Sequence, residues 1–174
     1  MPKIIENIRE KLIQEAKKQV LEQGYSSMTI RSVATACGVG VGTVYNYFSS
    51  KDMLVASFML EDWLQCQELI AEGCQAAKDA EEALYCMYTQ LKQFKESYTS
   101  LFTDDGAKEG FSSSSQQRHG MLRAQLAQPL LNWTGKQEKA EPQFLADFIA
   151  ESMLNLTMAG VEFDKISSVL LQLL

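Results

Sequence analysis

Hydrophobic residues recur every three or four positions along most of this chain, a pattern typical of amphipathic α-helices. Residues 3–23 show it first, with aliphatic side chains on one face, Glu and Lys on the other, and Gly24 as the stop. No segment shows the sustained apolar–polar alternation of a strand bounded by hairpin turns. The sequence therefore predicts an all-α protein of about nine helices.

Residues 29–48 predict two short helices around a glycine-containing turn. Thr29 is placed to cap the first helix with its hydroxyl, and Gly38 is placed to end it. The second helix is expected over residues 40–47, with Val44 on its inner face. Two short helices joined in this way are typical of a helix-turn-helix, whose second helix lies in the DNA major groove.

Longer helices are expected in the rest of the chain. The first begins behind the cap Ser50 and ends near Gly73, and the next covers residues 80–102. A Gly-, Ser- and acid-rich loop follows at 103–115. The remaining expected segments are a helix at 118–133 that Pro129 kinks or ends, a polar linker at 135–141, a helix at 144–158 with Pro142 in its first turn, and a last helix at 166–174 capped by Asp164.

Charge is unevenly distributed along the chain. The net charge is −6, but residues 1–60 hold seven basic and five acidic side chains, whereas the remainder holds nine basic and 17 acidic ones. Binding to a phosphate backbone requires local positive potential rather than a basic protein as a whole. The asymmetry favours a small DNA-facing head on an acidic body.

Several other classes of protein fit this sequence poorly. No apolar run approaches the roughly 20 residues that span a bilayer, and no signal peptide is recognisable, so a cytoplasmic protein is expected. The only histidine, His119, offers no base–nucleophile pair, so neither catalytic residues nor a cofactor are expected, and an enzyme or carrier is disfavoured. No metal site is expected, because the cysteines form no C-x-x-C pair. Reduced structural thiols are favoured over redox or metal sensing for the four cysteines, at 37, 66, 74 and 86.

The first sixty residues resemble the TetR family of bacterial transcriptional regulators. The resemblance begins with the helix that ends at Gly24 and continues through the motifs Thr29-Ile-Arg31, Val33-Ala34, Gly38-Val39, Gly42-Thr43-Val44-Tyr45, Tyr47-Phe48 and Ser50-Lys51. It covers about a third of the chain, and the remainder matches only in its architecture of long helices. The resemblance implies a three-helix DNA-binding domain at residues 1–50 and an effector-binding and dimerisation domain at residues 51–174.

The resemblance also implies a set of DNA contacts. Thr29, Tyr47 and Lys51 look like phosphate contacts, although Thr29 can be a helix cap only and Tyr47 can be purely structural. Arg31 occupies a place that can read a base in the family, with a solvated arginine as the alternative. The exposed side of the recognition helix supplies the other expected contacts, which are Val41, Gly42, Thr43, Tyr45 and Asn46.

The recognition helix departs from the family pattern at two positions. Gly40 stands where the family commonly has a Ser or Thr cap, and Val41 where a polar or basic residue is frequent. Gly42 inside a helix costs about 1 kcal/mol relative to Ala, and the absent side chain allows close approach to DNA. Because this helix carries no charged side chain, readout is expected to depend on Arg31, methyl contacts and DNA shape.

In the family, the body binds a ligand and forms the dimer. We expect a homodimer through the last two helices, with an internal core pair as the alternative, and an apolar or aromatic small-molecule effector. Aromatic residues at helical spacing are the candidate pocket, with a plain hydrophobic core as the alternative: Trp63, Tyr88, Phe94, Tyr98, Phe102, Trp133 and Phe148.

The expected function is that of a dimeric repressor that the effector releases from operator DNA. The effector would favour a body conformation that swings the helix behind Ser50 and changes the spacing of the two heads. The alternative is a TetR-like DNA binder that is controlled by a protein partner or by no ligand.

Overall fold

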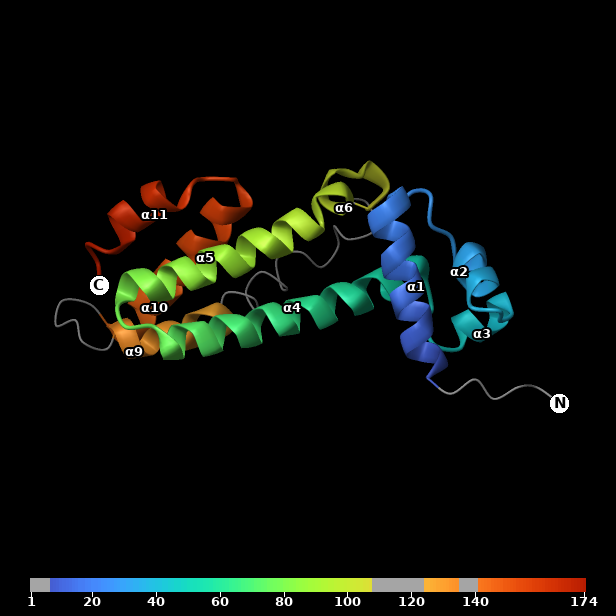
Figure 1. Ribbon diagram of the computed structural model, residues 1–174, viewed down its shortest axis with the longest axis horizontal. Coiled ribbons are helices and arrows are strands. Elements are labelled where there is room, and N and C mark those ends of the chain that lie inside the picture. The colour runs from blue at the N-terminus through green and yellow to red at the C-terminus, as the bar shows by residue number, and fades with distance from the viewer. Residues whose placement is uncertain (1–6, 108–123, 135–140) are drawn as a thin grey trace. The chain divides into compact units, whose positions relative to one another are not determined.

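Every regular element in the described part of the chain is a helix, so the predicted all-α fold class is confirmed (Figure 1). The computed structural model describes residues 7–107, 124–134 and 141–174. Within these residues, no helix is both long enough and apolar enough to cross a membrane.

The chain divides into two compact units. The first unit contains the described residues of Met1–Asp62 and Ser97–Ser113, and the second contains those of Trp63–Glu96 and Ser114–Leu174. Helix α4 (Lys51–Ala76) is continuous from one unit into the other. The predicted domain boundary after residue 50 stays a prediction; by its contacts, the start of α4 groups with the helices before it.

Three helices form most of the first unit: α1 (Ile8–Gln23), α2 (Ile30–Ala36) and α3 (Val41–Tyr45). The apolar face predicted for α1 is buried, and it packs with apolar side chains of α2, α3 and α4. This core contains Leu12, Ala16, Val20, Ile30, Val33, Val44, Phe48, Leu54 and Phe58. Packing of this face fixes the two short helices on a rigid support.

Two helices of this unit have bounds that differ from the predicted ones within the described residues. Within the described residues the first helix begins at Ile8, after Asn7, which has a left-handed backbone with φ 60°. Residues 3–6, which the prediction also included, lie outside the described part. The recognition helix covers Val41–Tyr45 rather than 40–47. Gly40 caps it in an extended conformation, and Tyr47 bonds back to Val44 in a tighter final turn.

Two predicted boundaries in the middle of the chain are wrong. Helix α4 passes through Gly73 to Ala76, because Gly73 packs against the neighbouring helix rather than ending its own. The helix predicted over 80–102 breaks into α5 (Ala80–Ser97) and α6 (Thr99–Thr103). Tyr98 has φ −112° and ψ 14° at the break, and its side chain is fully buried in the first unit.

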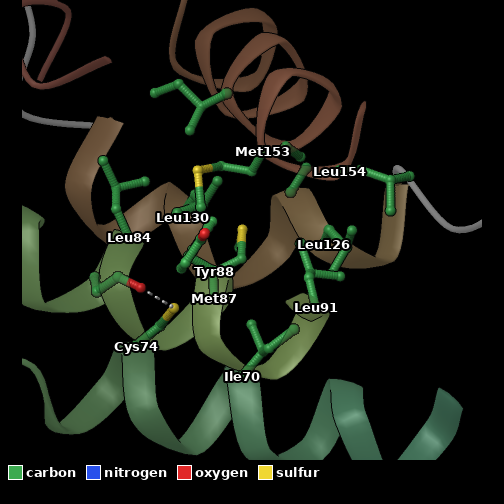
Figure 2. Close-up of a cluster of buried hydrophobic side chains, with 14 of the residues drawn as sticks. Ile70, Cys74, Leu84, Met87, Tyr88, Leu91, Leu126, Leu130, Met153 and Leu154 are labelled. Carbon is green, nitrogen blue, oxygen red and sulfur yellow. Dashed lines mark hydrogen bonds between the residues drawn. The ribbon is translucent and has the colours of Figure 1, made fainter. Parts of the chain in front are cut away.

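The second unit has its core where α4, α5 and α10 (Pro142–Met158) meet. Ile70 and Cys74 of α4 face Met87 and Leu91 of α5, and residues of α10 cover them from the other side (Figure 2). Each fully buried side chain of this kind stabilises the fold by roughly 1.5–3 kcal/mol. This core holds α4 and α5 side by side.

The last part of the chain follows the prediction closely, with two differences. Pro129 lies in a 3₁₀ turn, η2 (Gln128–Leu130), that interrupts the predicted helix before α9 (Leu131–Thr134); residues 118–123 lie outside the described part, as does most of the 135–141 linker. The final helix, α11, spans Phe163–Leu170 rather than 166–174. Its cap is Glu162, and the predicted cap Asp164 lies in its first turn.

Candidate nucleic-acid interface

Thr29 begins α2 with a complete capping box. Its Oγ1 accepts a hydrogen bond from the Ser32 backbone N–H at 3.0 Å, and the Ser32 Oγ accepts one from the Thr29 N–H at 3.1 Å. The Ser32 hydroxyl also donates to Gln19 Oε1 on α1 at 2.6 Å. The predicted cap is therefore confirmed, and the start of α2 is tied to the helix beneath it.

The turn between α2 and α3 depends on Gly38. This residue has φ 67°, and the Val39 N–H then donates to the Ala34 carbonyl at 2.9 Å. A residue with a Cβ adopts this left-handed conformation only with strain, which explains the glycine. The turn sets α3 against α2, as the helix-turn-helix prediction requires (Figure 1).

Helix α3 and the turn after it expose an uncharged surface. Val44 and Phe48 are buried, whereas 53% of Tyr45 and 47% of Tyr47 remain exposed. Asn46 is exposed as well. Val41 and Thr43, the other two predicted contacts with side chains in this helix, are half-buried at its edge.

No packing contact in the described part of the chain requires a glycine at position 42. A Cβ placed on it meets no atom within 4 Å, and its φ is not in the left-handed region. The residue lies on the exposed side of α3. No contact in the described part of the chain therefore offsets the cost of a glycine in this helix.

Arg31 is exposed on α2, two residues after the cap. It is the only charged residue between Gly24 and Ser50, which places a single positive charge on the α2–α3 surface. The structure brings Thr29, Arg31 and the exposed residues of α3 together on one helix pair, although their roles in contacting DNA stay predictions.

Lys51 lies at the first position of α4, behind the Ser50 cap, whose Oγ accepts the Met53 N–H at 3.1 Å. Its ammonium donates to the Tyr25 carbonyl and lies 3.9 Å from the centroid of the Tyr25 ring. Burial lowers the pKa of Lys51, and the carboxylates of Asp104 and Asp52 oppose that shift. The predicted phosphate contact is thus directed inward, toward the connection between α1 and α2.

Sequence reasoning missed the side chains that support this connection. Asp104 bonds to Ser26 across 78 positions of sequence, and Gln19 is a buried polar residue on the apolar face of α1. A glutamine among aliphatic residues at helical spacing was a readable signal for Gln19. Asp104 gave none, because it belongs to an acidic, glycine-containing stretch that reads as a loop.

The residues of the predicted effector pocket are distributed over different environments. Trp63 and Tyr88 belong to the core of the second unit, and Phe94 packs edge-on against Trp63 with ring centroids 5.3 Å apart. Trp133 packs against the same core. In the first unit, Tyr98 is buried beside Phe58 and Phe102 is exposed, whereas Phe148 is exposed on α10. The pocket stays a prediction.

An open groove of about 550 Å³ lies elsewhere on the second unit. None of the predicted pocket residues lines it, and most of its side chains are amides. Its lining residues are Gln67, Glu68, Ala71, Gln75, Gln125, Gln128, Pro129 and Asn132. All four cysteines of the chain are free thiols, and no group of three His, Cys, Asp or Glu in the described ranges is arranged to hold a metal ion.

Comparison with known proteins identifies the helix-turn-helix. Residues 12–58 match the family described as bacterial regulatory proteins, tetR family. Over 51 residues the chain is 41% identical to the HTH-type transcriptional regulator HbdR of Aromatoleum sp. (strain CIB), which covers 29% of this chain and 22% of HbdR. Over 67 residues it is 27% identical to the HTH-type transcriptional repressor AcnR of Corynebacterium glutamicum, which covers 38% of this chain and 36% of AcnR.

The fold as a whole also has a counterpart among solved structures. A TetR-family transcriptional regulator from Pectobacterium atrosepticum superposes with a TM-score of 0.64 at 20% sequence identity, covering 94% of this chain and 86% of that one. At this identity the likeness concerns the fold alone.

The capped α2, the Gly38 turn and the exposed α3 form a helix-turn-helix, the arrangement typical of DNA-binding domains. Residues 12–58 match the TetR-family model, which confirms the resemblance drawn from the motifs between Thr29 and Lys51. The chain aligns with only 22% to 28% of the length of the first curated relatives, so the activity of the whole protein is a matter of proposal.

Proposed function

We propose that this protein is a dimeric, sequence-specific transcriptional regulator that represses its target genes and is released from operator DNA by a small-molecule effector. The observation that carries the proposal is Gly42, an exposed helical glycine without an internal packing role, at the centre of the TetR-type recognition helix. A helix surface without a side chain at this point allows the backbone to approach the floor of the major groove closely.

In this proposal the contacts with DNA divide into two kinds. Thr29 uses its hydroxyl hydrogen, and Tyr47 its phenol, to bond phosphate oxygens, which fixes the register of the domain. Arg31 and Asn46 read base edges, for which arginine favours guanine and asparagine favours adenine. Val41, Thr43 and Tyr45 contact thymine methyl groups or the backbone, with Gly42 between them.

Lys51 is proposed to contact a phosphate while its ammonium stays bonded to Tyr25. A lysine ammonium has three N–H donors, and the Tyr25 carbonyl takes one of them. The remaining donors serve a phosphate that approaches the start of α4, where backbone N–H groups also attract anions.

An apolar surface on the last two helices supports the dimer. On α10, Phe144 is 66% exposed and Phe148 is 48% exposed, and on α11 Val169 is 59% exposed. Apolar side chains exposed in a group mark interaction sites more often than isolated ones do. We propose that a second copy covers this surface, and that the two recognition helices then enter major grooves about 34–36 Å apart.

Effector control is proposed to act through α4, which carries residues of both units in one continuous helix. An effector that binds one conformation of the body more tightly shifts the population toward it and away from the DNA-binding conformation. The alternative is a regulator that a protein partner controls, or that no ligand controls. A screen of apolar and aromatic compounds for release of bound operator separates the two.

The experiment that tests the proposal is selection of bound duplexes from a fragmented bacterial genome, followed by binding titrations on the selected sequence. We expect wild-type protein to retain one or a few related sequences with two-fold symmetry. Tyr47→Ala should weaken binding, and Tyr47→Ala with Lys51→Ala should abolish it. The matched control is Tyr85→Ala with Lys78→Ala, which removes the same chemistry from the second unit. Failure of wild-type protein to select any duplex would contradict the proposal.

A further inference from the structure

The carboxylate of Asp104 is the meeting point of four hydrogen bonds from two separate segments of the first unit. The Ser26 N–H donates to Oδ2 at 3.1 Å, and the Ser26 hydroxyl lies 2.9 Å from both oxygens. On its own side of the contact, Asp104 Oδ1 accepts from the N–H groups of Gly106 at 2.9 Å and Ala107 at 3.2 Å. These bonds, led by the Ser26 hydroxyl, lower the pKa of Asp104 and keep it charged.

Ser26 lies in the short connection between α1 and α2, three residues before the Thr29 cap. Its neighbour Tyr25 is fixed from the other side, since its carbonyl accepts from the Lys51 ammonium and its hydroxyl donates to Asp52. The connection is thus held between the start of α4 and the Asp104 turn. Every one of these residues belongs to the first unit.

A second contact attaches the segment that ends at Asp104 to the first unit, at the other end of that segment. The buried Tyr98 donates its hydroxyl to Asp62 Oδ2 at 2.5 Å, and Asp62 Oδ1 accepts from Lys17 Nζ of α1 at 2.6 Å. The Tyr98 ring also stacks on Phe58 of α4, with centroids 6.2 Å apart. The segment 98–104 is therefore anchored at one end to Asp62 and Phe58 of α4, and at the other end to the α1–α2 connection through Ser26.

We propose that Asp104 is a positioning residue for DNA binding, which holds the α1–α2 connection so that Thr29 and Lys51 are placed for the phosphate backbone before DNA arrives. This inference rests on the proposed function. In the proposed role, Asp104 itself does not contact DNA. Its effect passes through Ser26 to the cap of α2, and through Tyr25 to the lysine.

The physical basis is the cost of ordering a connection at the moment of binding. Each loop residue or side chain that must be immobilised on association subtracts from the affinity, so a preordered connection binds more tightly. Charge alone predicts the opposite change in DNA affinity: removing the Asp104 carboxylate reduces repulsion by the phosphates, so binding would become tighter. The direction of the effect therefore separates positioning from electrostatics.

Asp104→Asn is the variant that best separates the bonds to Ser26 from the bonds within the Asp104 turn. The remaining Oδ1 can still accept from Gly106 and Ala107, so the local turn is kept, but the amide cannot receive both bonds from Ser26. Ser26→Ala removes the partner hydroxyl without any change in charge. Glu72→Gln, an exposed residue of the second unit, is the control for loss of one negative charge.

The test measures affinity for the operator selected with wild-type protein, at a temperature at which circular dichroism shows each variant fully folded. We expect about 10-fold weaker binding for Asp104→Asn and for Ser26→Ala, and a double variant no weaker than about twofold below either single one. Glu72→Gln should bind as wild type does. Amide hydrogen exchange at Thr29 and Ser32 should be faster in both single variants than in wild type.

Binding of Asp104→Asn within about twofold of wild type, or tighter than wild type, would overturn the inference, as would strictly additive losses in the double variant. Unchanged hydrogen exchange at the α2 cap would overturn it too. A wild-type protein that binds no operator is a different outcome, because it contradicts the proposed function itself.

Discussion

Gly73 of α4 and Cys86 of α5 are in direct contact, and a Cβ placed on Gly73 would overlap the Cys86 sulfur and lie 3.1 Å from the Cys86 Cβ. The Cys86 thiol also points to the Leu69 carbonyl of α4 at 3.8 Å. Cys74 of α4 points to the Ala83 carbonyl of α5 at 3.7 Å, the contact drawn as a dashed line at Cys74 in Figure 2. A glycine and a small thiol thus allow the two long helices to approach closely.

Gly73→Ala is therefore expected to destabilise the protein although alanine favours helices. Overpacking costs typically 1–3 kcal/mol, against a gain of about 1 kcal/mol in helix propensity, so a net loss of up to about 2 kcal/mol is expected. Adding Cys86→Ala removes the sulfur and should recover most of this loss. Urea unfolding of the two single variants and the double variant measures the coupling. A Gly73→Ala protein more stable than wild type by about 1 kcal/mol, the full gain in helix propensity, would show that the helices separate without cost.

This contact also shows why parts of the fold escape prediction from sequence. A glycine at the end of an apolar pattern is a local stop signal, yet α4 continues through Gly73 because a distant thiol requires the space. Tyr98 likewise fits the periodicity of a long helix, but its hydroxyl bonds to Asp62 and the helix breaks there. Both errors concern tertiary contacts that no window of neighbouring residues contains.

The helix-turn-helix could be predicted for the opposite reason. The Thr29 cap, the left-handed Gly38 and the buried Val44 act over three to five residues, so their signals lie within the sequence that they organise. The support behind this element was missed, since Ser26 and Asp104 are far apart along the chain. Local chemistry thus predicted the helix-turn-helix but not the contacts that support it.

Gly42→Ala should separate stability from DNA binding. Because no atom lies within 4 Å of an added Cβ, the substitution should stabilise the protein by up to about 1 kcal/mol. Operator binding should nevertheless weaken, because the methyl group holds the helix away from the groove. Thermal unfolding and operator titration on the same preparation measure both effects. Gly40→Ala, at the edge of the helix, serves as the comparison. A Gly42→Ala protein that binds operator as tightly as wild type would contradict the proposal that Gly42 allows close approach to the groove.

The buried thiols should make the protein less stable in alkali. Burial raises the pKa of Cys66 to about 11 and that of Cys74 to about 12, and the nearby Cys86 adds to both shifts. An unfolded thiol loses its proton near pH 8.5, so above that pH the unfolded state binds fewer protons than the native state and stability falls. The decline should extend from about pH 8.5 to 11 for Cys66 and to 12 for Cys74, with a slope of up to about 1.4 kcal/mol per pH unit for each thiol.

Urea unfolding between pH 7 and 10.5 measures this slope, and a variant with Cys66→Ala and Cys74→Ala distinguishes the thiols from other alkaline groups. The variant should lose stability less steeply with pH than wild type does, although it is less stable at pH 7. Parallel curves for the two proteins would show that the cysteines do not carry the effect. The same burial predicts that iodoacetamide alkylates Cys66 and Cys74 far more slowly in the native protein than in urea.

Phe144 and Phe148 provide a test of the proposed dimer surface. They lie four positions apart on α10, so they occupy the same exposed face of the helix. Replacing both with Glu places two carboxylates where a second copy is proposed to pack, and a buried unpaired charge costs several kcal/mol. We expect wild-type protein to sediment as a dimer at micromolar concentration and the double variant to sediment as a folded monomer. Leu69→Glu, which adds a charge at a 41% exposed leucine of α4, should leave the dimer intact. A double variant that remains dimeric would place the interface on another surface.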